Sequence, residues 1–128
     1  MSGFTTHVLD TVSGGGARGI ALTLRARILP EAAFREVAEA RTDTNGRALL
    51  LGSEAIVPGL YELAFETLSY HQAAGHESFF EEVVLRVLVE EPGGSWHLPI
   101  ILSPAAFSAY RGGVPPADLA GLPPEMVA

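Results

Sequence analysis

Two histidines stand in segments of the sequence that otherwise resemble buried β-strands. His7 lies within residues 5–10, and His97 lies within residues 96–102. A polar, titratable side chain in an apolar strand costs free energy to bury unless it is paired, so each histidine needs a partner or a function. An imidazole exchanges protons near neutral pH, which makes it the usual side chain for general acid and base catalysis.

An arginine completes this set of candidate residues. Arg47 directly follows Asp43-Thr44-Asn45-Gly46, and an Asn-Gly pair predicts a tight hairpin because both residues adopt positive φ angles. We therefore expect Arg47 at the base of the strand that follows the turn. Its guanidinium carries a fixed charge on a planar fork that matches carbonyl oxygens. The two histidines and this arginine predict one assembled polar site.

Each of these signals also has a plain structural interpretation. A single histidine in a strand is more often a hydrogen-bonded structural residue than a catalyst, and an arginine after a turn is often a solvated charge. Zinc binding is a further alternative, which needs a third ligand and an open position. His71 and His76 are the remaining histidines, but their spacing matches no zinc motif. We expect both to be solvated loop residues, and we expect neither a metal nor another cofactor.

Composition narrows the class of protein. A chain of 128 residues with 48% hydrophobic and 18% charged residues is typical of one globular domain. Its net charge of -7 and lack of a basic cluster argue against nucleic acid as a partner. The absence of cysteine excludes disulfides and fits a reducing compartment. Neither a secretory leader nor a membrane-spanning apolar run is visible in the sequence, so we expect a cytoplasmic protein without a membrane partner.

Turn signals recur every ten to fifteen residues and predict an all-β sandwich or barrel. We expect strands at residues 4–12, 20–29, 34–41, 48–51, 60–67, 82–90, 95–102 and 107–111. Residues 68–75 are expected to form a short helix or a loop. Pairs of prolines interrupt residues 114–128, so this stretch should be a C-terminal extension to a domain formed by residues 1–113.

Strand alternation predicts which side chains share a face. His7 should lie on the face of Leu9, and His97 on the face of Pro99 and Ile101. An outer sheet face with so many apolar side chains is unusual for a monomer and predicts a subunit interface. The histidines would then line a groove between two subunits. The opposite face, which we expect to enter the core, carries Trp96, Leu98, Ile100 and Leu102.

Several separate motifs occur together in a specific order. They are Thr-His-Val-Leu-Asp-Thr at residues 6–11, Thr-Asn-Gly-Arg at 44–47, Phe-Phe-Glu-Glu-Val at 79–83, His-Leu-Pro-Ile-Ile-Leu-Ser-Pro at 97–104 and Tyr-Arg-Gly at 110–112. In these motifs the chain resembles the 5-hydroxyisourate hydrolases of the transthyretin-related family, over about residues 4–113.

The resemblance implies a fold, an assembly and a set of functional residues. The fold would be a transthyretin-like sandwich of two four-stranded sheets with one short helix. The assembly would be a homotetramer, a dimer of dimers with active sites in the channel between the dimers. His7, Arg47 and His97 match the family's catalytic positions. The positions implied to bind substrate are Tyr110, Arg111, Gly112 and Gly113.

The implied reaction is the hydrolysis of a ring amide of 5-hydroxyisourate, a purine-derived substrate of urate degradation. Its product would be 2-oxo-4-hydroxy-4-carboxy-5-ureidoimidazoline. His7 and His97 would share the acid and base steps, while Arg47 would orient the substrate and stabilise negative charge. No cofactor is implied.

Three departures from the family pattern leave alternatives open. Gly113 stands where the family has serine, the chain continues beyond that position, and Ser95 and Trp96 precede His97 in place of the frequent His-Tyr pair. One alternative is a hydrolase for a methylated hydroxyisourate. Another is a non-catalytic small-ligand carrier like transthyretin, although such carriers lose the catalytic residues. A third is a partner-binding variant that uses the C-terminal extension.

Overall fold

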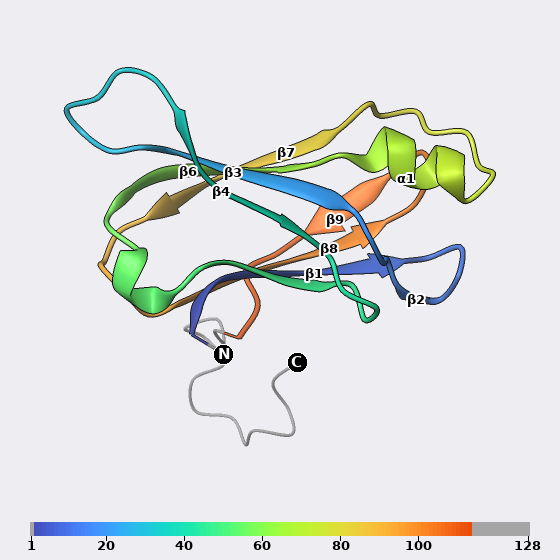
Figure 1. Ribbon diagram of the computed structural model, residues 1–128, viewed down its shortest axis with the longest axis horizontal. Helices are drawn as coiled ribbons and strands as arrows, with labels where there is room; N and C mark the ends of the chain where they lie inside the picture. The colour runs from blue at the N-terminus through green and yellow to red at the C-terminus, as the bar shows by residue number, and fades with distance from the viewer. Residues whose placement is uncertain (1, 114–128) are drawn as a thin grey trace.

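A computed structural model describes residues 2–113, in which two β-sheets pack face to face and a short helix lies at one end (Figure 1). The predicted extension at residues 114–128 lies outside the described residues. The sheets follow the strand order of the sequence only in part, because strands from both ends of the chain meet in the first sheet. This meeting positions the candidate site.

The first sheet is built around β1 (Gly3–Asp10). One edge of β1 pairs in parallel with β8 (Ser95–Leu102) along its whole length, and β8 pairs in turn with β9 (Phe107–Ala109). Along its other edge, the first part of β1 pairs with β5 (Arg47–Leu51), and its last two residues pair with β2 (Gly15–Gly16). The sheet is therefore four strands wide as predicted, and β2 adds a fifth strand of two residues that was not predicted.

The second sheet is antiparallel throughout, in the order β4-β3-β6-β7. Its strands are β4 (Arg35–Arg41), β3 (Ala21–Arg27), β6 (Gly59–Phe65) and β7 (Val83–Val89). All eight predicted strands are thus confirmed. A 3-10 turn, η1 (Ser53–Ala55), was not predicted and links β5 to β6.

Alternating apolar side chains from both sheets fill the space between them. Alternate residues of β3 are buried while their neighbours are half-buried, as the sequence predicted. The predicted core face of β8 is likewise buried except at Trp96, which is half-buried. The core includes Phe4, Val8, Leu22, Leu24, Tyr61, Leu63, Phe65, Leu98, Ile100 and Leu102.

The helix α1 (Thr67–Ala73) connects β6 to β7 and covers the end of β1 that carries Asp10 (Figure 1). The Tyr70 hydroxyl donates a hydrogen bond of 2.5 Å to the Asp10 carboxylate. One turn of helix separates Thr67 from His71, so both face inward and both are buried. The expectation that His71 is a solvated loop residue was therefore wrong. Burial lowers the pKa of His71 and favours its neutral form.

The predicted turn at residues 43–46 forms, but its two strands do not pair with each other. The Gly46 N–H donates to the Asp43 carbonyl, and the Asp43 N–H donates to the Arg47 carbonyl. Beyond the turn, β4 continues in the second sheet and β5 in the first. The turn is thus a link between the sheets, and it docks on β1 through a hydrogen bond from the Val8 N–H to the Gly46 carbonyl.

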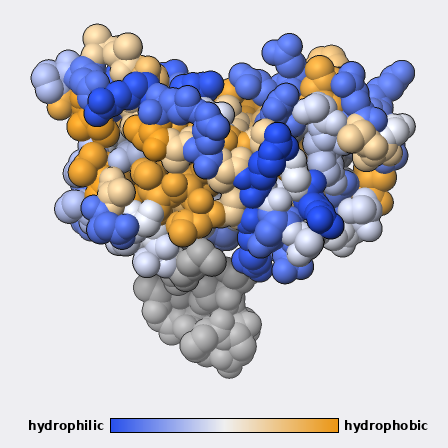
Figure 2. Space-filling view, in the orientation of Figure 1, coloured by the Kyte–Doolittle hydropathy of each residue, from blue (hydrophilic) through white to orange (hydrophobic). Residues whose placement is uncertain are grey.

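Apolar side chains also remain on the surface. Figure 2 shows them gathered left of centre in the view, in the part that β4 and β5 occupy in Figure 1. Val37 of β4 and Leu49 of β5 are exposed apolar residues of these two strands. Within residues 2–113, no helix is both long and apolar enough to cross a membrane.

The close approach of the turn to β1 makes Gly46 a sensitive position. Gly46 has a φ of 81°, and a Cβ there would collide with the Val8 carbonyl oxygen. Gly14 has the same φ but open space around it. We expect Gly14→Ala to lower the free energy of unfolding by about 1 kcal/mol, from backbone strain alone. Gly46→Ala should lower it by about 3 kcal/mol, because strain and collision add.

Urea denaturation of the two variants measures this difference. Equal losses of stability in Gly14→Ala and Gly46→Ala would contradict the close docking of the turn on β1.

Candidate active site

Two rows of paired residues cross the outer face of the first sheet. In one row, Thr5 of β1 pairs with Leu49 of β5 and with His97 of β8. In the other row, His7 of β1 pairs with Arg47 of β5. His7 lies two residues after Thr5 on β1, so both side chains are on the same face of the sheet. Residues directly opposite in neighbouring strands share a face. The register therefore brings the three predicted catalytic residues together.

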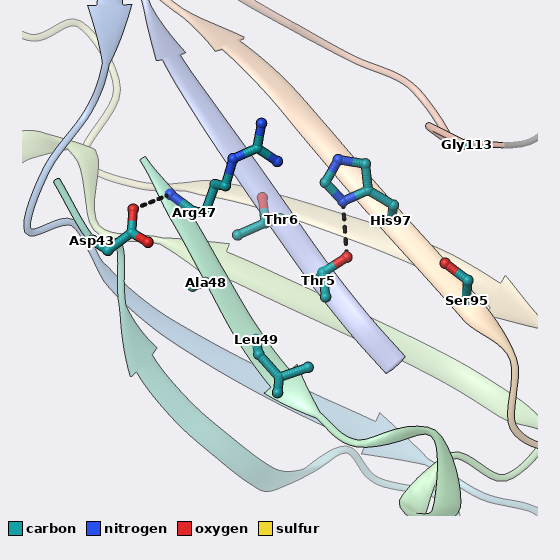
Figure 3. Close-up of a pocket in the computed structure, with 9 residues that line it drawn as sticks. All are labelled: Thr5, Thr6, Asp43, Arg47, Ala48, Leu49, Ser95, His97 and Gly113. Atoms are coloured by element: carbon teal, nitrogen blue, oxygen red, sulfur yellow. Dashed lines mark hydrogen bonds between the residues drawn. The ribbon is translucent and has the colours of Figure 1, made fainter. Parts of the chain in front are cut away.

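A hollow of about 400 Å³ lies over these rows. Figure 3 shows the Arg47 side chain reaching across β1 in the direction of the His97 ring. Arg47 and His97 line the hollow, and His7 sits beside it on β1. The lining residues are Thr5, Thr6, Asp43, Arg47, Ala48, Leu49, Ser95, His97 and Gly113.

The His97 ring is held from two sides. Its Nδ1 lies 2.8 Å from the Thr5 hydroxyl oxygen (Figure 3), which both donates and accepts hydrogen bonds. On the other side, Gly112 lies so close that a Cβ there would be 2.7 Å from His97 Cδ2. Thr5 thus occupies Nδ1, which leaves Nε2 as the other ring nitrogen able to accept or donate a proton.

The environment of His97 favours the neutral imidazole. Burial lowers the pKa of His97, and the positive charge of Arg47 lowers it further, as does His7 whenever its ring is protonated. A neutral ring at physiological pH is able to accept a proton, which is what a general base requires.

His7 is oriented by the turn between the sheets. Its Nε2 lies 2.9 Å from the Asn45 carbonyl oxygen. A carbonyl only accepts hydrogen bonds, so we assign the ring hydrogen to Nε2. Nδ1 of the neutral ring is then the nitrogen that accepts a proton.

Asp43 fixes the same turn from its other side. Its carboxylate accepts hydrogen bonds from the backbone N–H groups of Asn45, at 2.8 Å, and of Arg47, at 3.0 Å. These bonds hold the pKa of the Asp43 carboxyl below its usual value. The ion pairs within residues 2–113 join Arg35 to Glu31 and Arg86 to Glu62. Arg47 belongs to neither of these two pairs.

The four residues predicted to bind substrate occupy different places. Gly113 lines the hollow, and Gly112 packs against the His97 ring. The Tyr110 backbone N–H donates to the Pro99 carbonyl, while the Tyr110 residue as a whole is exposed. Arg111 stacks on the ring of Trp96.

Sequence reasoning missed several residues of the site. Thr5 could have been found from the sequence, because strand alternation places it on the same face as His7. Parallel pairing of β1 with β8 then brings Thr5 beside His97. Asp43 was recognised only as part of a turn, and Ser95 only as a departure from a motif. No sequence pattern indicated that Leu49 would border the hollow, since that depends on the pairing of β5 with β1.

The zinc alternative needed a third ligand near the two site histidines. His71 is instead buried on the inner side of α1, next to Asp10 and Tyr70. Among residues 2–113, no three histidine, cysteine, aspartate or glutamate side chains are grouped closely enough to hold a metal ion.

Comparison with known proteins agrees with this arrangement. Residues 4–112 match the HIUase/Transthyretin family. The chain belongs to this family. A 5-hydroxyisourate hydrolase from Mus musculus is 38% identical over 112 residues, which cover 87% of this chain and 95% of the mouse protein.

Solved structures of the HIUase/Transthyretin family share the fold. The 5-hydroxyisourate hydrolase of Klebsiella pneumoniae is 30% identical, with a TM-score of 0.73 over 88% of this chain and 100% of that protein. The transthyretin of Sparus aurata is 24% identical, with a TM-score of 0.77 over 84% of this chain and 93% of that protein. The second likeness shows the fold alone.

The charge of Arg47 gives a test of the site's electrostatics in this family member. Arg47→Gln removes one of the positive charges that lower the His97 pKa, so that pKa should rise toward its ordinary value. It should not return fully, because burial remains the largest cause. An NMR titration of the His97 ring measures the change.

Arg35→Gln is the matched control, because Arg35 is exposed and pairs with Glu31. It should leave the His97 titration unaltered. An unchanged His97 pKa in Arg47→Gln would show that the guanidinium does not act on the ring.

Proposed function

We propose that this protein hydrolyses 5-hydroxyisourate, opening a ring amide by addition of water at a carbonyl carbon. The observation that carries the proposal is the grouping of His7, Arg47 and His97 on one sheet face beside a hollow. The curated relatives named 5-hydroxyisourate hydrolase support the choice of substrate.

The first step requires a base that removes a proton from water. His97 suits this role because its lowered pKa keeps the ring neutral. Thr5 contacts Nδ1, so Nε2 is the ring nitrogen that would accept the proton. Attack of the activated water forms a bond from oxygen to the carbonyl carbon and leaves negative charge on the carbonyl oxygen. Thr5 would keep the ring pointed toward that water.

The second requirement is stabilisation of this oxyanion. Arg47 carries a permanent charge, forms no ion pair within the described residues and reaches across β1 toward His97 (Figure 3). A preorganised cation at a developing oxyanion is one of the largest contributions to catalysis of acyl transfer. The Asp43 bonds to the turn fix the strand position from which Arg47 extends.

The third requirement is a proton for the leaving nitrogen when the carbon-nitrogen bond breaks. His7 and His97 are the two groups in the site that transfer protons near neutral pH. The proton taken from water by one imidazole balances the proton delivered to the nitrogen. The product then carries a carboxylic acid and the released nitrogen with its added proton, and the acid loses its own proton to water.

Single substitutions test these roles. We expect His7→Ala and His97→Ala each to reduce kcat by about a hundred- to ten-thousand-fold, the usual effect of losing a positioned acid or base. Arg47→Ala should reduce kcat by about a hundred- to a thousand-fold through the lost charge at the oxyanion. The ultraviolet decay of freshly generated 5-hydroxyisourate, compared with its spontaneous rate, gives these values.

His76→Ala serves as the control, because His76 lies in the segment after α1 and outside the hollow. It should hydrolyse the substrate like the unaltered protein. Near-normal turnover in any of the three site variants would remove that residue from the mechanism.

A methylated hydroxyisourate is the second candidate substrate. The wall of the hollow at Gly113 carries no side chain. Apart from Gly113 and its chain neighbours, no atom of the described residues lies within 4 Å of where its Cβ would be. That opening gives room for a substituent on the ring. A comparison of kcat/KM for substrates with and without a methyl group decides between the two.

We propose further that the protein assembles as a homotetramer, a dimer of dimers. Leu9 and Ile101 pair across β1 and β8 on the face of the site, and they are 37% and 38% exposed. Leu49, at the edge of the hollow, is 54% exposed. An apolar face of this kind is stabilised when a second subunit covers it. The cytoplasmic location expected from the sequence stays a prediction.

Charge on this face should break the assembly. Leu9→Glu and Ile101→Glu would bury a carboxylate in the contact, so we expect species smaller than a tetramer in sedimentation velocity. Leu29→Glu is the control, because Leu29 is 83% exposed and lies outside this sheet. Tetramers that persist in both Leu9→Glu and Ile101→Glu would place the interface elsewhere.

A further inference from the structure

The Arg111 side chain lies against the ring of Trp96, away from the hollow. Its guanidinium carbon is 4.2 Å from the ring centroid. A guanidinium over an indole face is attracted by the electrons of the ring. Trp96 and His97 are consecutive residues of β8, so their side chains leave the strand on opposite faces. Arg111 is thus fastened on the face that does not carry His97.

Trp96 is a fixed platform for this contact. Its indole Nε1 donates a hydrogen bond of 2.7 Å to the Gly93 carbonyl oxygen, and the residue is half-buried. The bond ties the ring to the turn before β8. A ring held in this way keeps its orientation when a cation stacks on it.

The residues after Arg111 return to the face of the site. The Gly112 N–H donates to the His97 carbonyl at 2.9 Å, and a Cβ on Gly112 would be 2.9 Å from Pro99 Cγ and nearer still to the His97 ring. Gly113 then forms part of the wall of the hollow. Residues 111–113 therefore connect two sites: the stack of Arg111 on Trp96, on one face of β8, and the His97 ring, on the other face.

Two backbone hydrogen bonds also hold this segment against β8. β9 ends at Ala109, and beyond it the described backbone bonds to β8 are those of Tyr110 with Pro99, at 3.3 Å, and of Gly112 with His97. Neither glycine has a side chain that could anchor it. Within residues 2–113, the stack of Arg111 on Trp96 is the side-chain contact next to Gly112 that joins this segment to β8.

We propose that Arg111 and Trp96 form a clamp that positions His97 and the wall at Gly113. Both are positioning residues, and neither touches the substrate. This assignment rests on the proposed function and changes the role that the sequence predicted for Arg111, from substrate binding to alignment of the catalytic ring.

The first test reads the clamp without any reaction. Trp96 is the single tryptophan of the chain, so tryptophan fluorescence reports on the surroundings of this residue alone. Arg111→Gln should increase quenching of Trp96 by acrylamide and should shift the NMR signals of the His97 ring. Trp96→Leu should shift the same His97 signals. Arg35→Gln, which removes an equal charge elsewhere, should change neither readout.

The second test is a double-mutant cycle on hydrolysis. Arg111→Gln and Trp96→Leu should each lower kcat for 5-hydroxyisourate by about ten-fold with a small effect on KM. The double variant should also lose about ten-fold rather than about a hundred-fold, because both changes remove one contact. Trp96→Tyr keeps an aromatic face and should retain most of the activity.

Any one of three results would overturn the clamp. Unchanged Trp96 quenching in Arg111→Gln would mean that the stack does not persist in solution. A rise in KM with Arg111→Gln alone, or losses that multiply in the double variant, would mean that Arg111 acts on the substrate. If the unaltered protein does not hydrolyse 5-hydroxyisourate, the proposed function fails, and the Trp96 and His97 signals still decide whether the clamp positions the ring.

Discussion

The parallel pairing of β1 with β8 is the constraint on which the rest of the site depends. Side chains alternate along both strands, so a register shift of one residue would move His97 to the core side and separate it from Thr5. The register is fixed by the opposite face, where Val8 and Ile100 pair and are fully buried. Packing of the core thus sets the geometry of the polar face.

The two histidines are held by different kinds of partner. A backbone carbonyl receives the hydrogen of His7, which fixes one form of the neutral ring. A hydroxyl contacts His97, and a hydroxyl accommodates a ring nitrogen with or without a hydrogen. The site therefore combines a ring of fixed tautomer with a ring whose proton is free to move, next to a cation that does not titrate.

Much of this was predictable from the sequence, because the decisive patterns are local. Alternation in residues 20–29 and 95–102 identified strands and their core faces, and the Asn45-Gly46 pair identified a turn. The expectations that were wrong, or that could not be made, depended on contacts between distant segments. The turn links two sheets because β5 finds its partner in β1, and His71 is buried because α1 docks on the end of β1. The stack of Arg111 on Trp96 also has no local signal, since it joins a residue after β9 to the start of β8.

The Thr5–His97 contact joins residues that are 92 positions apart in the chain. Pairing over so long a separation requires the closure of a large loop. The chain loses this conformational entropy before any contact stabilises it, which slows the folding of β-rich domains. During synthesis, β1 leaves the ribosome early and has no partner for its long edge until β8 follows. The polar face is then among the last features to form, so a chain cut short before β8 would have His7 and Arg47 but no assembled site.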